Sequence, residues 1–217
     1  MAHDRDLNRT RESIVAAASM EFARKGFAGA RTDAIARRAG VNERMIFYCF
    51  DNKEGVYREI LRRKLSEKMR LLDTGPENDF AASLVNGFEM CAGDVDLLRM
   101  VQWEELQGGT ELWTASEEHQ TLQRAAAAQL RRLKARGALP HDTDEQMLQL
   151  VAVALKTLPF LLPQLTRQVS GHDPKDPRFR RRWVKCLRWL GERIGNAGVK
   201  RDGAAQERDR QVASHGH

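Results

Sequence analysis

The apolar residues of this 217-residue chain recur at helical spacing along most of its length. In the first such stretch, from Asn8 to Gly26, they stand three or four positions apart, at Ile14, Val15, Ala18 and Phe22. That period puts them on one face of a helix, and glycine is common just past a helix C-terminus. The pattern therefore predicts an amphipathic helix that ends at Gly26.

Two short helices and a longer one are predicted next. Thr32 is placed to cap the first short helix, which Gly40 ends, and Asn42 is placed to cap the second. Asp51 or Asn52 is placed to cap the longer helix. Short polar residues favour these positions because their side-chain oxygens accept hydrogen bonds from the first free N–H groups of a helix.

Five further apolar stripes follow Pro76, in residues 80–91, 97–106, 122–133, 147–165 and 179–194. No stretch alternates apolar and polar residues between hairpin turns, as a strand of a sheet would. The polar tail after Asn196 has no stripe, so we expect it to be mobile. The pattern as a whole predicts an all-α protein.

Composition narrows the class of protein. Hydrophobic residues make up 41% of the chain and charged residues 30%, as in ordinary soluble domains. The three cysteines are scattered, which argues against a disulfide framework or a zinc cluster and favours a reducing cytoplasm. The N-terminus is charged and lacks the apolar core of a secretory signal. The apolar run from Leu148 to Leu165 contains Lys156 and two prolines, so a buried or partner-facing helix is preferred to a membrane span.

The net charge of +6 is distributed unevenly along the chain. Residues 1–64 carry 14 basic and 9 acidic side chains, residues 65–175 carry 11 and 16, and residues 176–217 carry 11 and 5. Two basic ends around an acidic middle suggest that one end meets a polyanion, although a chance distribution of solvated charges would look the same. The basic cluster at residues 180–182 fits a solvated face better than a second DNA site.

Residues 30–56 hold the most informative pattern. Two predicted short helices are joined by only Gly40, Val41 and Asn42. Ile35 and Ala36 on the first can pack against apolar residues of the second, and Gly40 permits the sharp turn of the backbone. This describes a helix-turn-helix, whose second helix lies in the major groove of DNA.

The segment GARTDAIARRAGVNERMIFYCFDNKEGVY resembles the DNA-binding domain of the TetR family of bacterial transcriptional regulators. RTRESIVAAASMEFARKGF is similar to that family's first helix, and the resemblance is strong over residues 10–57. In this family the domain precedes a larger helical domain that binds a small molecule and dimerises. We therefore expect a three-helix DNA-binding domain in residues 1–56, a ligand-binding and dimerisation domain in residues 57–196, and a mobile tail in residues 197–217.

The resemblance assigns DNA contacts to nine residues, namely Arg31, Thr32, Asn42, Glu43, Arg44, Met45, Phe47, Tyr48 and Lys53. Arg44 has the donors to bond guanine, Glu43 an acceptor for cytosine N4, and Met45 a side chain to touch a thymine methyl. Glu43 has an equal alternative, because a carboxylate also stabilises the N-terminus of its own helix.

The remaining contacts are expected on the phosphate backbone. Phe47 and Tyr48 match the family's aromatic pair there, but Phe47 replaces the usual tyrosine and has no hydroxyl to donate. Arg31 and Thr32 offer donors to a phosphate, and Lys53 resembles the family's backbone-contacting lysine. The alternatives are that Arg31 and Lys53 are plain surface charges and that Phe47 belongs partly to the core.

Aromatic residues and methionines of the middle segment are candidates for lining a ligand pocket: Phe88, Met100, Trp103, Trp113, Met147 and Phe160. Residues of this kind at helical spacing are more often plain core. Nothing in the sequence indicates a cofactor or a metal site. The unidentified small-molecule ligand is thus implied by the resemblance alone.

The two last apolar stripes are candidates for the dimer interface, at Leu158, Leu162, Leu165, Trp183, Leu187, Leu190 and Ile194. Helix pairs from two subunits would bury them as a four-helix bundle. Pro159 and Pro163 are expected to kink the first of these helices.

The favoured function is a homodimeric repressor that a small molecule releases from a palindromic operator in double-stranded DNA. The alternative is a constitutive DNA-binding protein whose C-terminal domain only dimerises. An enzyme is disfavoured because the chain has no phosphate-binding loop, no GxSxG elbow and no HExxH motif.

Overall fold

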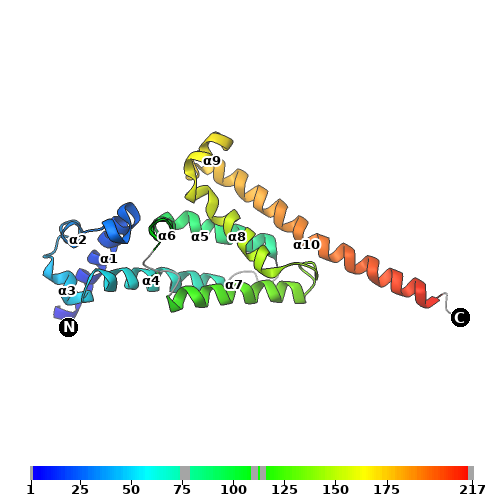
Figure 1. The fold of residues 1–217 in the computed structure, drawn as a ribbon, viewed down its shortest axis with the longest axis horizontal. Coiled ribbons are helices and arrows are strands. Elements are labelled where there is room, and N and C mark those ends of the chain that lie inside the picture. Colours follow the sequence, from blue (N-terminus) through cyan, green and yellow to red (C-terminus); the bar gives the residue numbers. More distant parts are fainter. Residues whose placement is uncertain (1, 74–78, 109–111, 113–115, 215–217) are drawn as a thin grey trace. The chain divides into compact units, whose positions relative to one another are not determined.

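The structure is a computed structural model that describes residues 2–73, 79–108, 112 and 116–214. Within these residues it consists of helices joined by turns, with no strand (Figure 1). The helices are α1 (Ala2–Gly29), α2 (Thr32–Ala39), α3 (Arg44–Phe50), α4 (Lys53–Asp73), α5 (Phe80–Gly93), α6 (Val95–Gln107), α7 (Glu117–Ala135), α8 (Glu145–Leu161), α9 (Pro163–Ser170) and α10 (Pro177–Ser214). The predicted all-α fold is confirmed.

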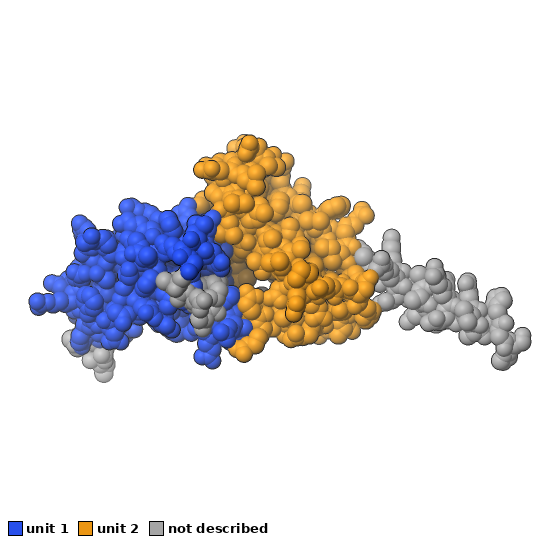
Figure 2. Space-filling model, in the orientation of Figure 1, with its two compact units in different colours: residues 1–72, 94–122 blue, residues 73–93, 123–217 orange. Residues whose placement is uncertain are grey.

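The chain folds into two compact units, which Figure 2 colours separately. Unit 1 combines residues 1–72 with residues 94–122, and unit 2 combines residues 73–93 with residues 123–217. This division differs from the expected boundary after residue 56. It differs because α4 and α6 share the apolar interior of α1–α3, a long-range contact that local sequence patterns do not contain.

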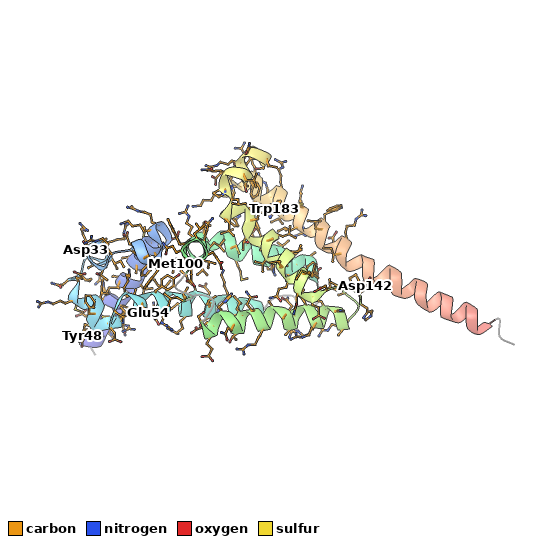
Figure 3. All side chains as sticks on the ribbon, viewed as in Figure 1. Asp33, Tyr48, Glu54, Met100, Asp142 and Trp183 are labelled. Atoms are coloured by element: carbon orange, nitrogen blue, oxygen red, sulfur yellow. The ribbon has the colours of Figure 1, made fainter. Side chains whose placement is uncertain are left out.

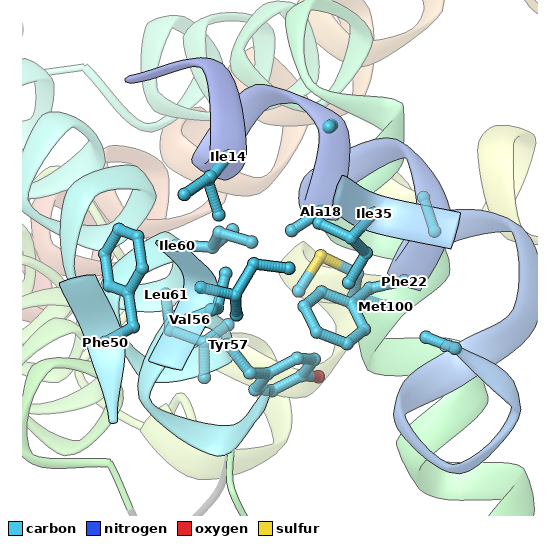
Figure 4. Close-up of a cluster of buried hydrophobic side chains, with 14 of the residues drawn as sticks. Ile14, Ala18, Phe22, Ile35, Phe50, Val56, Tyr57, Ile60, Leu61 and Met100 are labelled. Carbon is cyan, nitrogen blue, oxygen red and sulfur yellow. The ribbon is translucent and has the colours of Figure 1, made fainter. Parts of the chain in front are cut away.

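Unit 1 is built around one buried cluster (Figure 4). Each of its helices contributes at least one side chain that is fully or almost fully buried: Ile14 and Phe22 from α1, Ile35 from α2, Ile46 from α3, Tyr57 from α4 and Met100 from α6. The Tyr57 ring meets Phe22 edge-on, with 5.0 Å between ring centroids. Full burial of a side chain of this size contributes about 1.5–3 kcal/mol. The five helices therefore stabilise one another through a common interior.

Helix α6 is joined to the rest of unit 1 by a buried hydrogen bond and a close approach. The Tyr57 hydroxyl donates to Glu104 Oε2 over 3.3 Å. Burial, together with the Glu104 carboxylate, raises the pKa of Tyr57, so the hydroxyl stays protonated and remains a donor. At Gly26, where α1 breaks as predicted with φ 72°, an added Cβ would lie 3.0 Å from Trp103 Cγ. Gly26 thus allows both the kink in α1 and the approach of α6.

The turns around α3 follow the predicted capping residues except at Thr32. Gly40 ends α2 in the left-handed conformation, and Asn42 Oδ1 accepts a hydrogen bond from the Arg44 N–H over 2.9 Å. Of the two candidates for capping α4, Asn52 is the one whose side chain accepts, from the Gly55 N–H. Thr32 was expected to cap α2, but it is the first helical residue and its hydroxyl donates elsewhere.

In unit 2, α5 packs against both α8 and α10 (Figure 1). The rings of Phe88 and Phe160 stack between α5 and α8, 5.3 Å apart. On the α10 side, an added Cβ at Gly191 would lie 2.3 Å from Ala81 Cα, so the glycine permits close packing of the two helices. Helix α10 runs through Ser214, well beyond the expected end of the last helix near Ile194.

The long apolar stripe of residues 147–165 forms two helices rather than one. Helix α8 ends at Leu161, and Pro163 begins α9 at an angle of 88°. The Thr166 hydroxyl donates to the Pro159 carbonyl over 3.2 Å across this bend. In the part of the chain that the structure describes, no single helix has the length and hydropathy to cross a membrane; only the bent pair α8–α9 meets those criteria together.

The α3–α4 turn predicts a sharp dependence of stability on Gly55. An added Cβ there would lie 2.0 Å from the backbone oxygen of Phe50, which cannot rotate away. Gly55→Ala is therefore expected to lower the free energy of unfolding by about 2 kcal/mol or more, measured by urea denaturation. Gly93→Ala is the control, because an added Cβ there meets nothing within 4 Å. Equal stability of the two variants would contradict the steric argument.

Candidate nucleic-acid interface

Helix α3 divides its seven residues between the core and solvent. Ile46, Cys49 and Phe50 are buried, whereas Phe47 and Tyr48 are 48% and 68% exposed. Figure 3 labels Tyr48 on this helix. Because the buried side chains orient α3, its opposite face presents two aromatic rings to solvent. Phe47 is thus mainly a surface residue.

The start of α3 presents polar and charged side chains. Arg44 and Asn42 are exposed. Met45 is partly buried against the core cluster, so only part of its side chain is available for a thymine methyl. Within the part of the chain that the structure describes, the Arg44 guanidinium has no ion-pair partner. Its donors are therefore not engaged by a described carboxylate, and its contact with a base edge stays a prediction.

A hydrogen bond links the two helices of the helix-turn-helix. The Thr32 hydroxyl, at the start of α2, donates to Glu43 Oε1 over 2.5 Å. Glu43 directly precedes α3, so this contact ties the N-terminus of α3 to that of α2. One carboxylate oxygen of Glu43 is thereby engaged within the protein. This contact differs from both roles expected for Glu43, since its side chain accepts no hydrogen bond from the start of its own helix and a contact with cytosine stays a prediction.

Arg11 of α1 holds the other end of α3. Its Nη1 donates to the Cys49 carbonyl over 2.5 Å, and its guanidinium lies 4.4 Å from the centroid of the Phe50 ring. A carbonyl in the last turn of a helix has no partner within the helix, so Arg11 satisfies it. Sequence reasoning missed Arg11, because its partner lies 38 residues away and no local pattern marks the pair.

Lys53 is engaged with the end of α1. Its Nζ donates to the carbonyls of Phe27 and Ala30, over 2.8 and 3.1 Å, and lies 4.5 Å from the centroid of the Phe27 ring. Partial burial lowers the pKa of Lys53. An ammonium group has three donors, so one remains for a phosphate. Lys53 therefore joins α4 to α1, and the phosphate contact that the resemblance assigns to it stays a prediction.

The surface beside α2 carries an excess of positive charge. Arg31 donates to Asp33 Oδ1 over 3.0 Å, and Arg37 lies 3.7 Å from the same carboxylate. The bond from Arg31 holds the pKa of Asp33 below its usual value, so the carboxylate stays ionised. Two cations sharing one carboxylate leave a net positive surface, to which the exposed Arg38 adds another charge.

Burial raises the pKa of the Cys49 thiol, so this side chain of α3 remains neutral. It faces the interior with Ile46 and Phe50. Its place in the motif is explained by packing, and it takes no part in the exposed face.

The six predicted ligand residues are distributed over both units. Phe88 and Phe160 stack in unit 2, whereas Met100 is a core residue of unit 1 and Trp103 lies over Gly26. Met147 is 54% exposed on α8, and Trp113 lies outside the described residues. Of the described members of this set, the structure brings together Phe88 and Phe160. Helical spacing in the sequence predicts that a residue is buried, but not which of the two interiors it joins.

The predicted dimer residues also separate. Leu158, Leu162 and Leu165 are 39–46% exposed, as an unpartnered face would be. The prediction for Leu187 is wrong, because this side chain is fully buried within its own chain, where α10 packs on α5. Trp183 is held inside unit 2 as well, since its Nε1 donates to the Leu155 carbonyl over 3.2 Å. Leu190 and Ile194 are partly buried.

Comparison with known proteins agrees with this geometry. The family model described as bacterial regulatory proteins, tetR family, matches residues 14–60. The HTH-type transcriptional repressor SCO4008 of Streptomyces coelicolor is 30% identical over 191 residues, which cover 87% of this chain and 98% of the repressor.

Two solved structures share the architecture. The transcriptional regulator SCO4942 of Streptomyces coelicolor has a TM-score of 0.67 and 25% identity, covering 83% of this chain and 97% of that one. FadR of Bacillus subtilis, solved in complex with stearoyl-CoA, has a TM-score of 0.61 and 18% identity, covering 81% and 96%. The near full-length match to a named repressor and the helix-turn-helix geometry lead to one conclusion: the chain belongs to the TetR family of bacterial transcriptional regulators.

Proposed function

We propose that this protein is a homodimeric transcriptional repressor that binds a palindromic operator and is released from it by a small-molecule ligand. The observation that carries the proposal is the way in which α3 is held in place. Its buried face and the contacts of Thr32 and Arg11 at its two ends hold it rigidly, while Arg44, Phe47 and Tyr48 remain exposed. A pre-oriented helix of this kind fits the major groove without first having to be ordered.

In the proposed complex, the base contacts come from the start of α3. Arg44 supplies two parallel donors for guanine O6 and N7, and Asn42 and Met45 flank it. The phosphate contacts come from the rim of the motif. Tyr48 and Lys53 donate from α3 and α4, and the N-terminus of α2 beside Arg31 offers free backbone N–H groups.

The proposed dimer interface is formed by the exposed apolar residues of α8 and α9, a stripe that is regular in sequence and turns by 88° at Leu162. Its members stand three or four residues apart along the two helices: Met147, Val151, Ala154, Leu158, Leu162, Leu165 and Val169. An apolar stripe of this length is typical of a protein–protein interface. Two copies joined there would present two α3 helices to half-sites about 34 Å apart.

Release by a ligand follows from differential binding to two states of the dimer. A molecule held among the helices of residues 79–165 that prefers a spacing unsuited to the operator lowers DNA affinity by the ratio of its two binding constants. The complex of FadR with stearoyl-CoA supports the proposal that this chain also binds a small molecule. Operator selection from random double-stranded DNA tests the proposal, which requires the enriched sequences to be inverted repeats.

Arg44→Ala is expected to abolish discrimination between the selected operator and a copy mutated at one guanine. The loss of a bidentate contact amounts to about 1–3 kcal/mol of specificity. Gel-shift competition between the two DNAs measures it. Specificity equal to that of the unmodified protein would remove Arg44 from the base contacts.

Lys53→Ala is expected to weaken binding to all DNA sequences alike and to reduce the slope of log affinity against log salt by about one. Because Lys53 also bonds the end of α1, the variant is expected to unfold at a lower temperature, so binding is measured well below its Tm. Arg99→Ala, which removes an exposed charge on α6, is the control. An unchanged salt slope in Lys53→Ala would count against the phosphate contact.

Leu165→Glu is expected to convert the dimer into monomers in sedimentation velocity, because it places a charge within the proposed apolar interface. Leu106→Glu is the matched control: Leu106 is 74% exposed but lies on α6, outside the stripe. A dimer that persists in Leu165→Glu would contradict the assignment of this surface.

A further inference from the structure

Lys156 occupies an unusual place in unit 2. It lies on α8, in the face that packs against α5, and its side chain crosses Gly87. An added Cβ at Gly87 would lie 2.6 Å from Lys156 Cδ and 2.7 Å from Cε. The absence of a side chain at position 87 is therefore what lets the lysine enter the space between the two helices.

A pair of stacked rings lies one helical turn from Lys156. Phe160, one turn further along α8, stacks on Phe88, the neighbour of Gly87 on α5. Removal from water lowers the pKa of Lys156, and the Cys91 thiol is the ionisable group, among those described, whose charge acts on it. The lysine thus lies near a thiol and one helical turn from the stacked rings.

Carboxylates of unit 2 that form ion pairs do so with other cations. Glu89 pairs with Arg180, Glu145 with Lys134 and Asp173 with Arg167. Within the residues that the structure describes, Lys156 has no carboxylate within ion-pair distance. Each of these acidic side chains is therefore committed elsewhere, and the amine has no counter-charge among the described residues of its own unit.

A partly buried cation without a counter-charge is costly, and a bound anion removes that cost. Proteins seldom retain such a group for stability, since an apolar residue of similar length packs better. A carboxylate brought by a ligand would restore the charged amine and accept its hydrogen bonds. The neighbouring phenyl rings favour a ligand that is apolar beyond that carboxylate.

We propose that Lys156 is the anchor for the carboxylate of an organic acid with an apolar body, bound between α5 and α8. This inference rests on the proposed function in one respect, because it names the chemical class of the ligand held by residues 79–165. Lys156 forms the ion pair, and Gly87 provides the room for its side chain.

Calorimetry on the full chain without DNA tests the proposal. The probes are decanoate and phenylacetate, each compared with the alcohol of the same skeleton, decan-1-ol and 2-phenylethanol. The unmodified protein is expected to bind at least one acid about tenfold or more tightly than its alcohol. Lys156→Met keeps the length of the side chain and is expected to lose that preference. Lys175→Met, which changes an exposed lysine of the same unit, is expected to keep it.

Equal affinity for acid and alcohol in the unmodified protein overturns the proposal, and so does a preference that survives in Lys156→Met. Should Lys156→Met fail to fold, the unmodified protein labelled with ¹⁵N at lysine gives the answer by NMR. Decanoate or phenylacetate is then expected to shift the Lys156 amine resonance, and an unshifted resonance overturns the proposal.

The outcome is separable from that of the proposed function. Binding of an acid through Lys156 with no effect on operator binding supports the anchor and contradicts release by this ligand. Operator binding that is lost on addition of an uncharged ligand, with no preference for acids, supports release by a ligand and overturns the anchor.

Discussion

Helix α3 is seven residues long, which is too short to persist in water without tertiary contacts. It exists because Ile46, Cys49 and Phe50 are buried and because neighbouring helices satisfy both of its ends. The interior of unit 1 therefore does more than stabilise the fold. It sets the orientation of the face on which Arg44 and Tyr48 stand, and the proposed recognition of DNA depends on that orientation.

The same interior extends beyond the three helices of the DNA-binding motif. Tyr57 lies against Phe22 and bonds Glu104, so α4 and α6 are joined through one buried side chain. Interiors of this density do not deform gradually, and a shift of one helix is felt by the others. Any movement of α6 would thus be transmitted to α1 and α4 by direct packing within unit 1.

The charge of a segment can be interpreted only when the ion-pair partners of its side chains are known. The positive N-terminal segment keeps its excess because Arg31 and Arg37 share one carboxylate. The basic cluster of α10 is partly engaged within the protein, since Glu89 neutralises Arg180 and Arg182 donates to the Ser170 carbonyl. The C-terminal cluster was expected to be a solvated face. Part of it instead makes contacts that hold α10 in unit 2.

The sequence by itself determined the helical class, the helix-turn-helix and the exposed candidates Arg44 and Tyr48. These follow from local signals, namely a helical period, a glycine turn and capping side chains, each of which acts over a few residues. It did not determine which interior a residue joins. Met100 and Phe88 have similar sequence signals but belong to different units, and Leu187 is buried inside its own chain.

Tertiary structure alone decided the contacts between residues that are distant in sequence. Arg11 bonds α3 from 38 positions away, Lys53 is engaged by the end of α1, and Lys156 lies over Gly87. No local pattern encodes such pairs, because they form only when packing brings two helices together. The physical reason for the division is range: hydrogen bonds and periodicity within a helix are local, whereas burial depends on the whole chain.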